Sequence, residues 1–396
     1  MLLSKKAKNT AADAAMTEET EQTEENTAGE KVKIGDCTPI WCRVFYCMAG
    51  VSAVMLVLFY LSEEFSDFYN RYIGSAFRIV LSKITGWIPF SLAETLLMML
   101  PVILVCLLIL VFKTYKKTFE ELLRLLMIML AVLSYFFSSF VLAFCAGYHG
   151  TPIEEKLGLD REKVSPEELA CTAKWLSGEM NALVPEIRFT ADSFSDMPFT
   201  FGEMNGKLME AYKTACKKYD FIPDFTSRAK KIILSEPMTY THVSGVYSYF
   251  TGESNINVNF PDYILPFTAA HELAHQRGVA REDEANFVAF LVCIESDEPY
   301  IKYSAYLNVY EYVMNSLYSA DKELYKEVIA GADLTIRYEM AAYNEFFAKY
   351  EKNVAAAVAG KVNDTYLKTQ GQKAGEKSYD LVTDLAVAWY KKEINR

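Results

Sequence analysis

The sequence predicts an α-helical membrane part followed by an α+β domain that is mostly helical and contains a small antiparallel sheet. Three observations lead to this prediction. Long uncharged apolar runs occur repeatedly before Gly150. After Gly150 the composition becomes that of a soluble globular domain, which is long enough to build a sizeable core. Within that domain, one short region alternates polar and apolar residues, as strands do, between stretches of helical periodicity.

The composition favours a membrane protein and excludes a general nucleic-acid binder. The chain has 396 residues, of which 52% are hydrophobic, and a net charge of −11. The apolar excess lies in the N-terminal part, which predicts membrane segments and therefore the lipid bilayer as a partner. No nucleic-acid partner is expected, because proteins that bind nucleic acid generally present basic surfaces.

Residues 1–43 are expected to form a disordered cytoplasmic tail. Up to Gly35 the chain is rich in Ala, Thr, Glu and Lys and has almost no large apolar residues. Such a segment cannot bury enough apolar surface to offset the entropy that ordering would cost. It also lacks the short apolar core and the cleavage site of a signal peptide.

Residues 44–149 are expected to hold three transmembrane helices. Each apolar run is uncharged and long enough to cross about 30 Å of hydrocarbon. One such run could be a buried helix of a soluble protein, but three in succession favour a membrane. The runs are Val44–Leu61, Thr95–Phe112 and Leu125–Ala146.

The basic residues predict the orientation of these helices. The short link between the second and third runs contains Lys113, Lys116, Lys117 and Arg124, a density typical of cytoplasmic loops. The N-terminus is then cytoplasmic as well, and residues 150–396 form an extracytoplasmic domain.

The first outer loop is predicted to be an amphipathic helix. Apolar residues recur at helical spacing from Phe65 to Ile84, and Gly86 and Pro89 end the pattern. Two placements remain open for this helix. It lies in the membrane interface with Trp87 among the headgroups, or it packs beneath the C-terminal domain.

Residues 150–396 contain clear signals for individual helices and strands. A capping box at Ser165 predicts a helix through Leu183. Further along, the period of the apolar residues changes from helical to alternating and back again. The expected elements are a helix over Phe201–Tyr219, strands at Lys231–Leu234, Val246–Phe250 and Asn255–Phe260, and helices from Phe267 onward.

The feature that carries chemistry is the pentapeptide from His271 to His275, which contains Glu272. On a helix the two histidines are four residues apart and face the same side, so both imidazoles can bind one zinc ion. Glu272 is not a ligand in this arrangement. Zinc lowers the pKa of a bound water toward about 7, and a carboxylate beside it can take the proton.

A catalytic zinc site usually has a third protein ligand, and the next predicted helix supplies the candidates. Gly278 permits a reversal between the two helices. Glu282 shares a helix face with Ala285 and Ala289, whose small side chains allow close approach, and this favours Glu282 as the ligand. Glu284 lies on a different face and is the alternative. Acidic residues are also common in the first turn of any helix.

These residues resemble known metallopeptidase families. His271–His275 with Glu282 and the following Ala-Asn resembles the glutamate-zincins (gluzincin-like enzymes), in which a Glu of the next helix completes the zinc site. Glu-Ala-Asn-Phe-Val-Ala, starting at Glu284, resembles the ImmA/IrrE-type signature. Arg-Glu-x-x-Ala-Asn, starting at Arg281, resembles the HtpX-like and CAAX-prenyl proteases, although Asn286 stands where Asp is usual.

The whole layout is similar to an uncharacterised bacterial family of three-pass membrane proteins with an outer HExxH domain. The similar segments are residues 86–91, 249–253, 271–287 and 363–368. The resemblance implies a zincin-like fold for residues 150–396, zinc as the cofactor and the bacterial cell membrane as the location. A metzincin site is excluded, because Arg281 stands where the third histidine of that motif would be.

The remaining candidates have weaker signals. Asn286 is a candidate to support a zinc ligand, and Arg281 to orient substrate. Asn255 and Asn257 lie on the strand before the His271 helix, where zincin-like folds bind an extended substrate along an edge strand. Tyr366 is a candidate because it lies in the last similar segment.

The sequence therefore predicts a membrane-anchored zinc metallopeptidase that hydrolyses a peptide or protein substrate on the outer face of the membrane. The alternative is a catalytically inactive, zinc-containing sensor or scaffold that binds an extracellular or cell-wall ligand. A transporter is disfavoured, because the three apolar runs contain no charged residues.

Overall fold

The structure is a computed structural model that describes residues 38–115, 118–351, 353–372, 374–375 and 381–394. Most of the expected tail, residues 1–37, lies outside the described residues. The first described helix begins at Ile40, earlier than the expected start of the first membrane segment at Val44.

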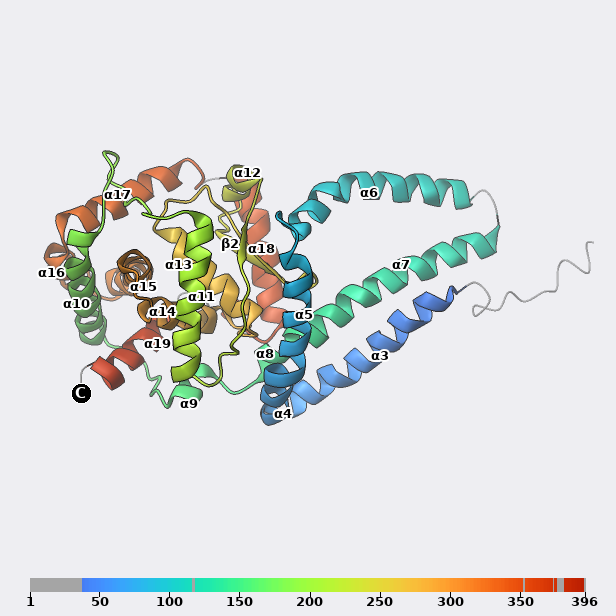
Figure 1. Cartoon of the computed structure of the whole chain (residues 1–396), viewed down its shortest axis with the longest axis horizontal. Coiled ribbons are helices and arrows are strands. Elements are labelled where there is room, and N and C mark those ends of the chain that lie inside the picture. The colour runs from blue at the N-terminus through green and yellow to red at the C-terminus, as the bar shows by residue number, and fades with distance from the viewer. Residues whose placement is uncertain (1–37, 116–117, 352, 373, 376–380, 395–396) are drawn as a thin grey trace, which may run out of the picture. The chain divides into compact units, whose positions relative to one another are not determined.

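The N-terminal part consists of helices (Figure 1). In chain order they are α3 (Ile40–Leu61), α4 (Glu63–Phe68), η1 (Tyr69–Gly74), α5 (Ser75–Gly86), α6 (Leu92–Tyr115), α7 (Phe119–Phe140), η2 (Val141–Cys145), α8 (Ala146–His149) and α9 (Ile153–Leu157). Among the described residues, three helices are long and apolar enough to cross a membrane: Ile40–Leu61, Leu92–Tyr115 and Phe119–His149. They contain the three predicted apolar runs, which confirms the three apolar helices.

The C-terminal part is mostly helical and contains one small sheet. Its elements are α10 (Pro166–Leu183), η3 (Val184–Glu186), α11 (Phe201–Lys218), β1 (Ala229–Lys231), α12 (Ser235–Thr239), β2 (Gly245–Ser248), β3 (Glu253–Ile256), α13 (Ile264–Gln276), α14 (Glu282–Ile294), α15 (Pro299–Ala320), α16 (Lys322–Gly331), α17 (Leu334–Ala348), α18 (Val354–Thr369), α19 (Val382–Trp389) and η5 (Tyr390–Ile394). The capping box predicted at Ser165 is present, with reciprocal bonds between Ser165 and Glu168.

The contacts divide the chain into two compact units. The smaller unit comprises Met1–Met48 and Val102–Tyr135, and the larger unit comprises Ala49–Pro101 and Phe136–Arg396. The larger unit thus contains one end of each candidate span together with the sheet and all helices from α8 onward. Every contact described below lies within this larger unit.

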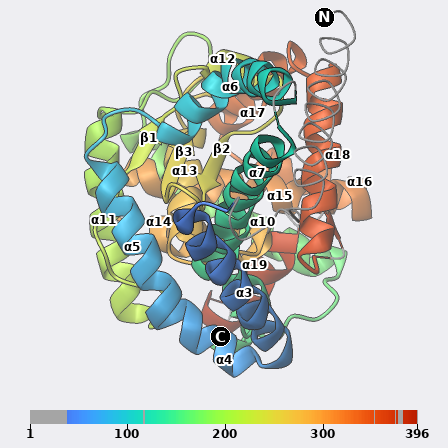
Figure 2. The ribbon, with the colours of Figure 1, turned by 90° about the vertical axis from the view of Figure 1, so that its right-hand side faces the viewer.

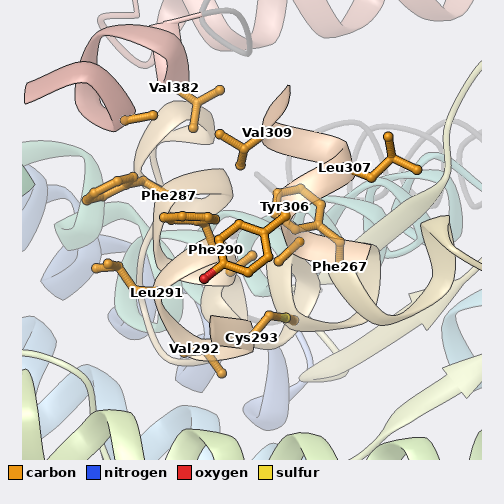
Figure 3. Packing of buried hydrophobic residues seen from close by; sticks show 14 of the residues in the cluster. Phe267, Phe287, Phe290, Leu291, Val292, Cys293, Tyr306, Leu307, Val309 and Val382 are labelled. Atoms are coloured by element: carbon orange, nitrogen blue, oxygen red, sulfur yellow. The ribbon is translucent and has the colours of Figure 1, made fainter. Parts of the chain in front are cut away.

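The core of the larger unit lies among α10, α13, α14, α15 and α19. Figure 3 shows Phe287 and Phe290 of α14 packed toward Tyr306 of α15, with Val382 of α19 nearby. Nearly every residue of α14 is buried, including its acidic first turn. Burying one large apolar side chain stabilises the fold by about 1.5–3 kcal/mol, so this cluster holds α13 and α14 in a fixed relation.

The sheet is mixed rather than antiparallel, which corrects the prediction. The strand order is β1-β3-β2 (Figure 2), with β2 antiparallel and β1 parallel to β3. The parallel pair joins Ala229 to Ser254, two residues far apart in sequence. Local alternation identifies a strand but carries no information about such a distant partner, so the sequence could not predict the parallel pairing.

The last strand is also shorter than predicted. It ends at Ile256 rather than Phe260, although the backbone N–H of Asn257 still donates to the carbonyl of Ser244. Asn257 donates to the carbonyl of Val243 and accepts from the backbone N–H of Asn259. Such local side-chain bonds compete with strand pairing.

A buried ion pair attaches the start of α6 to the sheet. Lys230 of β1 lies 2.5 Å from the Glu253 carboxylate of β3, and both side chains are almost fully buried. Glu253 also accepts the backbone N–H groups of Leu92 and Ala93, which lack partners within the helix. Lys230 donates to the Phe90 carbonyl. Two of the segments that carry the family resemblance, residues 86–91 and 249–253, therefore meet here.

Candidate metal centre

Helix α13 presents two histidines on one face. His271 and His275 are one turn apart, and their ring centroids are 4.5 Å from each other. The helix lies against β3, where Ser254 donates to the backbone carbonyl of Glu272. All residues of α13 are buried, so both imidazoles are held in the interior rather than on a solvated surface.

A tight turn brings the next helix back toward these histidines. Gly278 has a φ of +94°, a conformation that residues with a side chain rarely adopt. Its N–H donates to the carbonyl of His275, and the N–H of Val279 donates to that of Ala274. The chain thereby ends α13 and returns to begin α14 at Glu282.

The turn also orients the second imidazole. Nδ1 of His275 lies 2.7 Å from the carbonyl oxygen of Val279. A carbonyl can only accept, so Nδ1 carries a proton and donates it. Nε2 then faces Glu282. Histidines that bind metals commonly use their second nitrogen in this way.

Glu282 completes a group of three potential ligands. Its Oε2 is 3.2 Å from Nε2 of His271 and 3.3 Å from Nε2 of His275. Among the described residues, these three side chains form a group whose donor atoms all lie within 4.8 Å of one another. The sequence favours Glu282 over Glu284 as the third ligand, and Glu282 is the carboxylate that lies beside the two histidines.

Two of the three separations in this group are those that a bound zinc ion would require. Ligands about 2.0–2.1 Å from a zinc ion at tetrahedral angles are about 3.3 Å apart. The two separations between Glu282 and the imidazoles, 3.2 and 3.3 Å, match that spacing. Two imidazoles and one carboxylate are also a usual donor set for catalytic zinc, which leaves a fourth position for water.

Glu272 lies beside the group without belonging to it. Its side chain is buried, and its Oε2 has no hydrogen-bond partner among the described residues. Burial raises the pKa of the Glu272 carboxyl to about 6. A Cβ atom on Gly245 would lie 2.6 Å from Oε1 of Glu272, so the absent side chain at this position gives the carboxylate its room.

The charges of the three potential ligands depend on one another. Burial by itself would lower the pKa of His275, but the charge of Glu282 and its hydrogen bond outweigh burial and raise that pKa to about 9. Burial disfavours the charged form of Glu282, yet the two imidazoles hold the pKa of its carboxyl well below the ordinary value. In the absence of metal, the group is therefore an imidazolium–carboxylate pair.

Glu284 and Arg281 have other partners. Arg281 Nη1 donates to Oε1 of Glu284 at 2.8 Å, and its Nη2 donates to the carbonyls of Tyr148 and Gly150. Glu284 also accepts the backbone N–H of Ile153. This pair fastens the α8–α9 connection to the start of α14, and among the described residues neither side chain belongs to the metal group.

Two of the three candidate asparagines donate to groups outside the metal group. Asn255 donates to the carbonyls of Val246 and Glu253, and Asn257 donates to Thr239 and Val243. Asn286 is buried, and its Nδ2 has no partner among the described residues.

The strand of Asn255 is not the expected edge strand. It is the central strand of the sheet, and both of its backbone edges are paired. Of the two edge strands of the described sheet, β2 is the one that contributes Gly245, which lies against Glu272, and Tyr247, which lies against His275.

Aromatic side chains that the sequence did not single out form one wall of the centre. The ring of Phe144 in η2 meets the ring of His275 edge-on at 5.8 Å, and Tyr247 of β2 stacks on His275 at 6.5 Å. Tyr366, which was a candidate, shares a hydrogen bond of 3.1 Å with Tyr148, and burial raises its pKa. Phe144 lies inside an apolar run, where no local signal distinguishes it from its neighbours.

The comparisons with known proteins identify a family. Residues 69–387 match the family model described as "Protein of unknown function (DUF3810)". No curated protein and no solved structure matches the chain. The matched region includes α5, the sheet, the metal group and α18. Because this region covers most of the chain, the protein belongs to the DUF3810 family.

Proposed function

We propose that the protein is a membrane-anchored zinc metallopeptidase that hydrolyses peptide bonds on the outer face of the membrane. The observation that carries this proposal is the spacing of Oε2 of Glu282 from the two imidazole Nε2 atoms, 3.2 and 3.3 Å. This spacing suits a bound zinc ion. In a zincin-like arrangement, the two histidines of α13 and the Glu282 carboxylate of α14 would be the three protein ligands.

Glu272 is the proposed catalytic base. A zinc ion bound by His271, His275 and Glu282 would act as a Lewis acid on the peptide carbonyl and on water. In the metal-free protein, burial raises the pKa of the Glu272 carboxyl to about 6, so this carboxylate has a higher proton affinity than an exposed one. Glu272 takes a proton from the attacking water and passes it to the nitrogen of the leaving amine.

Burial of the centre favours a second candidate function. The side chains of His271, His275 and Glu282 are each exposed by 10% or less. A peptide must therefore reach a largely enclosed site. A catalytically inactive, zinc-containing sensor or scaffold, which binds an extracellular or cell-wall ligand, would be under no such requirement.

The variant Glu272→Gln separates the two functions. Glutamine has nearly the shape of glutamate but cannot accept the proton, so the variant keeps the zinc and loses hydrolysis if the protein is a peptidase. The readout is the set of new protein termini in membranes from cells that produce either full-length form, with zinc measured on the same preparations. New termini that appear with the wild type and are missing with Glu272→Gln would support the peptidase. A variant that retains zinc, and whose termini and cellular phenotype equal those of the wild type, supports the sensor or scaffold.

A further inference from the structure

The third candidate span reaches the metal centre itself. Helix α7 continues without interruption through η2 and α8, so that the apolar stretch runs from Phe119 to His149. Phe144, in this continuation, is the residue whose ring meets that of His275 at 5.8 Å. Tyr148, one turn later, shares its hydrogen bond with Tyr366.

The backbone of the span is in direct contact with the turn that positions the ligands. A Cβ atom on Gly147 would lie 2.4 Å from the carbonyl oxygen of Gly278, so only glycine allows α8 to approach the turn this closely. The buried guanidinium of Arg78 donates to the carbonyls of Ala143, in the span, and Arg277, at the end of α13. No spacer therefore separates the span from the centre.

The length of the span gives the height of the centre above the hydrocarbon. A helix needs about 20 residues to cross about 30 Å of hydrocarbon. If the helix enters the hydrocarbon at Phe119, it leaves near Ser138. Phe144 then lies about 9 Å outside the hydrocarbon, because each residue of a helix adds about 1.5 Å. Counted from Leu125, the residue after Arg124, it leaves near Phe144 itself. With the 5.8 Å between the rings, His275 lies within about 15 Å of the hydrocarbon.

Two helices beside the span have exposed apolar faces at this same end of the larger unit. Figure 2 shows α5 and α18 on opposite sides of the sheet and α13. Helix α5 exposes Val80 and Ile84, and Trp87, which follows it, is 88% exposed. Helix α18 exposes Val354, Val358 and Val362, spaced four residues apart on one face. Such faces suit the interface of a bilayer.

We propose that the substrate is a polypeptide with a membrane anchor of its own, cut within about five residues of that anchor. The inference rests on the proposed peptidase function and adds the substrate class. A height of about 15 Å corresponds to four or five extended residues at about 3.3 Å each. A soluble folded protein would have to reach a buried centre that lies close to the bilayer surface.

The height can be measured without any catalysis. An environment-sensitive fluorophore on Val246→Cys, an exposed position of β2 next to Gly245, reports the position of the centre when the full chain is reconstituted in liposomes. The control is Lys326→Cys on α16, which Figure 1 shows on the side of the larger unit away from α5. The accessible native cysteines are replaced by serine in both. Lipids with headgroup quenchers should quench the Val246 label strongly and the Lys326 label little. Equal quenching of both labels would overturn the inference.

The positions of the cuts supply the second test. New termini that require Glu272 should cluster within about five residues of a transmembrane segment or a lipid-modified residue of membrane proteins. Glu272-dependent termini in soluble proteins, or far from any anchor, would overturn the substrate class and leave the peptidase proposal standing. If the protein is loaded with zinc and yet no new terminus depends on Glu272, both the peptidase function and the substrate class are overturned. The fluorophore measurement would still report the height of the centre.

Discussion

The carbonyl oxygen of Val279 lies 2.7 Å from Nδ1 of His275 and fixes the proton on that nitrogen. Any proton that His275 loses on binding a metal must then come from Nε2, the nitrogen that faces Glu282. The loop between α13 and α14 thus does more than reverse the chain. Its Val279 carbonyl holds Nδ1 of His275 and leaves Nε2 free to bind a metal. The same loop places Glu282 beside that Nε2.

Zinc binding is predicted to strengthen as the pH rises. The pKa of His275 is raised to about 9, so its imidazolium is the main form of the metal-free protein at neutral pH and loses its proton only above about pH 9. Zinc must displace this proton. The apparent affinity should therefore rise about tenfold per pH unit between about 7 and 9 and level off above that range.

Competition with a chelator across this pH range measures the affinity, and calorimetry in two buffers of different ionisation enthalpy counts the protons released. Glu282 adds no proton of its own, because its pKa is held well below the ordinary value. An affinity that is independent of pH between 7 and 9 would contradict the imidazolium–carboxylate pair.

Replacing Glu282 and replacing Glu284 are predicted to have different consequences. Glu282→Ala removes a proposed ligand and should lower zinc affinity by orders of magnitude. Glu284→Ala should keep one zinc per chain but lower the free energy of unfolding by about 1–3 kcal/mol, because Nη1 of Arg281 and the N–H of Ile153 both lose the carboxylate to which they donate. Zinc titration and thermal unfolding of both variants measure the two effects. Equal loss of zinc in both variants would indicate general disruption of α14.

Gly147→Ala is predicted to damage the contact between α8 and the ligand-bearing turn. The new methyl group would lie 2.4 Å from the carbonyl oxygen of Gly278 and 2.8 Å from Cβ of Ala280. Relieving this overlap should cost about 1–3 kcal/mol of stability and weaken zinc binding. The control is Gly206→Ala in α11, where a Cβ atom meets nothing within 4 Å and should stabilise the helix by about 0.5–1 kcal/mol. Thermal unfolding of the full chain in detergent compares them, and equal shifts would refute the contact.

The sequence predicted the parts of the centre that depend on local spacing. His271 and His275 share a face because an α-helix turns once in 3.6 residues. The choice between Glu282 and Glu284 followed from the same periodicity, which turns residues two positions apart to different faces. The three apolar helices were equally predictable, because hydrocarbon thickness sets their length.

What the sequence did not predict depends on contacts between distant segments. The pairing of β1 with β3 joins Ala229 to Ser254, and nothing near either residue encodes its partner. Arg78 lies on a helix whose pattern predicted only an amphipathic surface, yet it is buried between Ala143 and Arg277. Phe144 is one apolar residue among many in its run, and only the fold brings it to His275.

The orientation proposed from the basic residues predicts an extracytoplasmic C-terminus. Lys113, Lys116, Lys117 and Arg124 should keep their loop in the cytoplasm. A reporter that is active only outside the cytoplasm, fused after Arg396, should therefore be active, while the same reporter inserted after Lys117 should be silent. The reverse pattern would show that the metal centre faces the cytoplasm.

The zinc content of the full-length protein tests the central claim most directly. Elemental analysis of protein purified in detergent without chelator should find one zinc ion per chain. His271→Ala and His275→Ala should each abolish this stoichiometric zinc, and Glu272→Gln should retain it, because only the first two remove ligands. A folded wild-type protein that contains no zinc and takes up none at neutral pH would contradict the account.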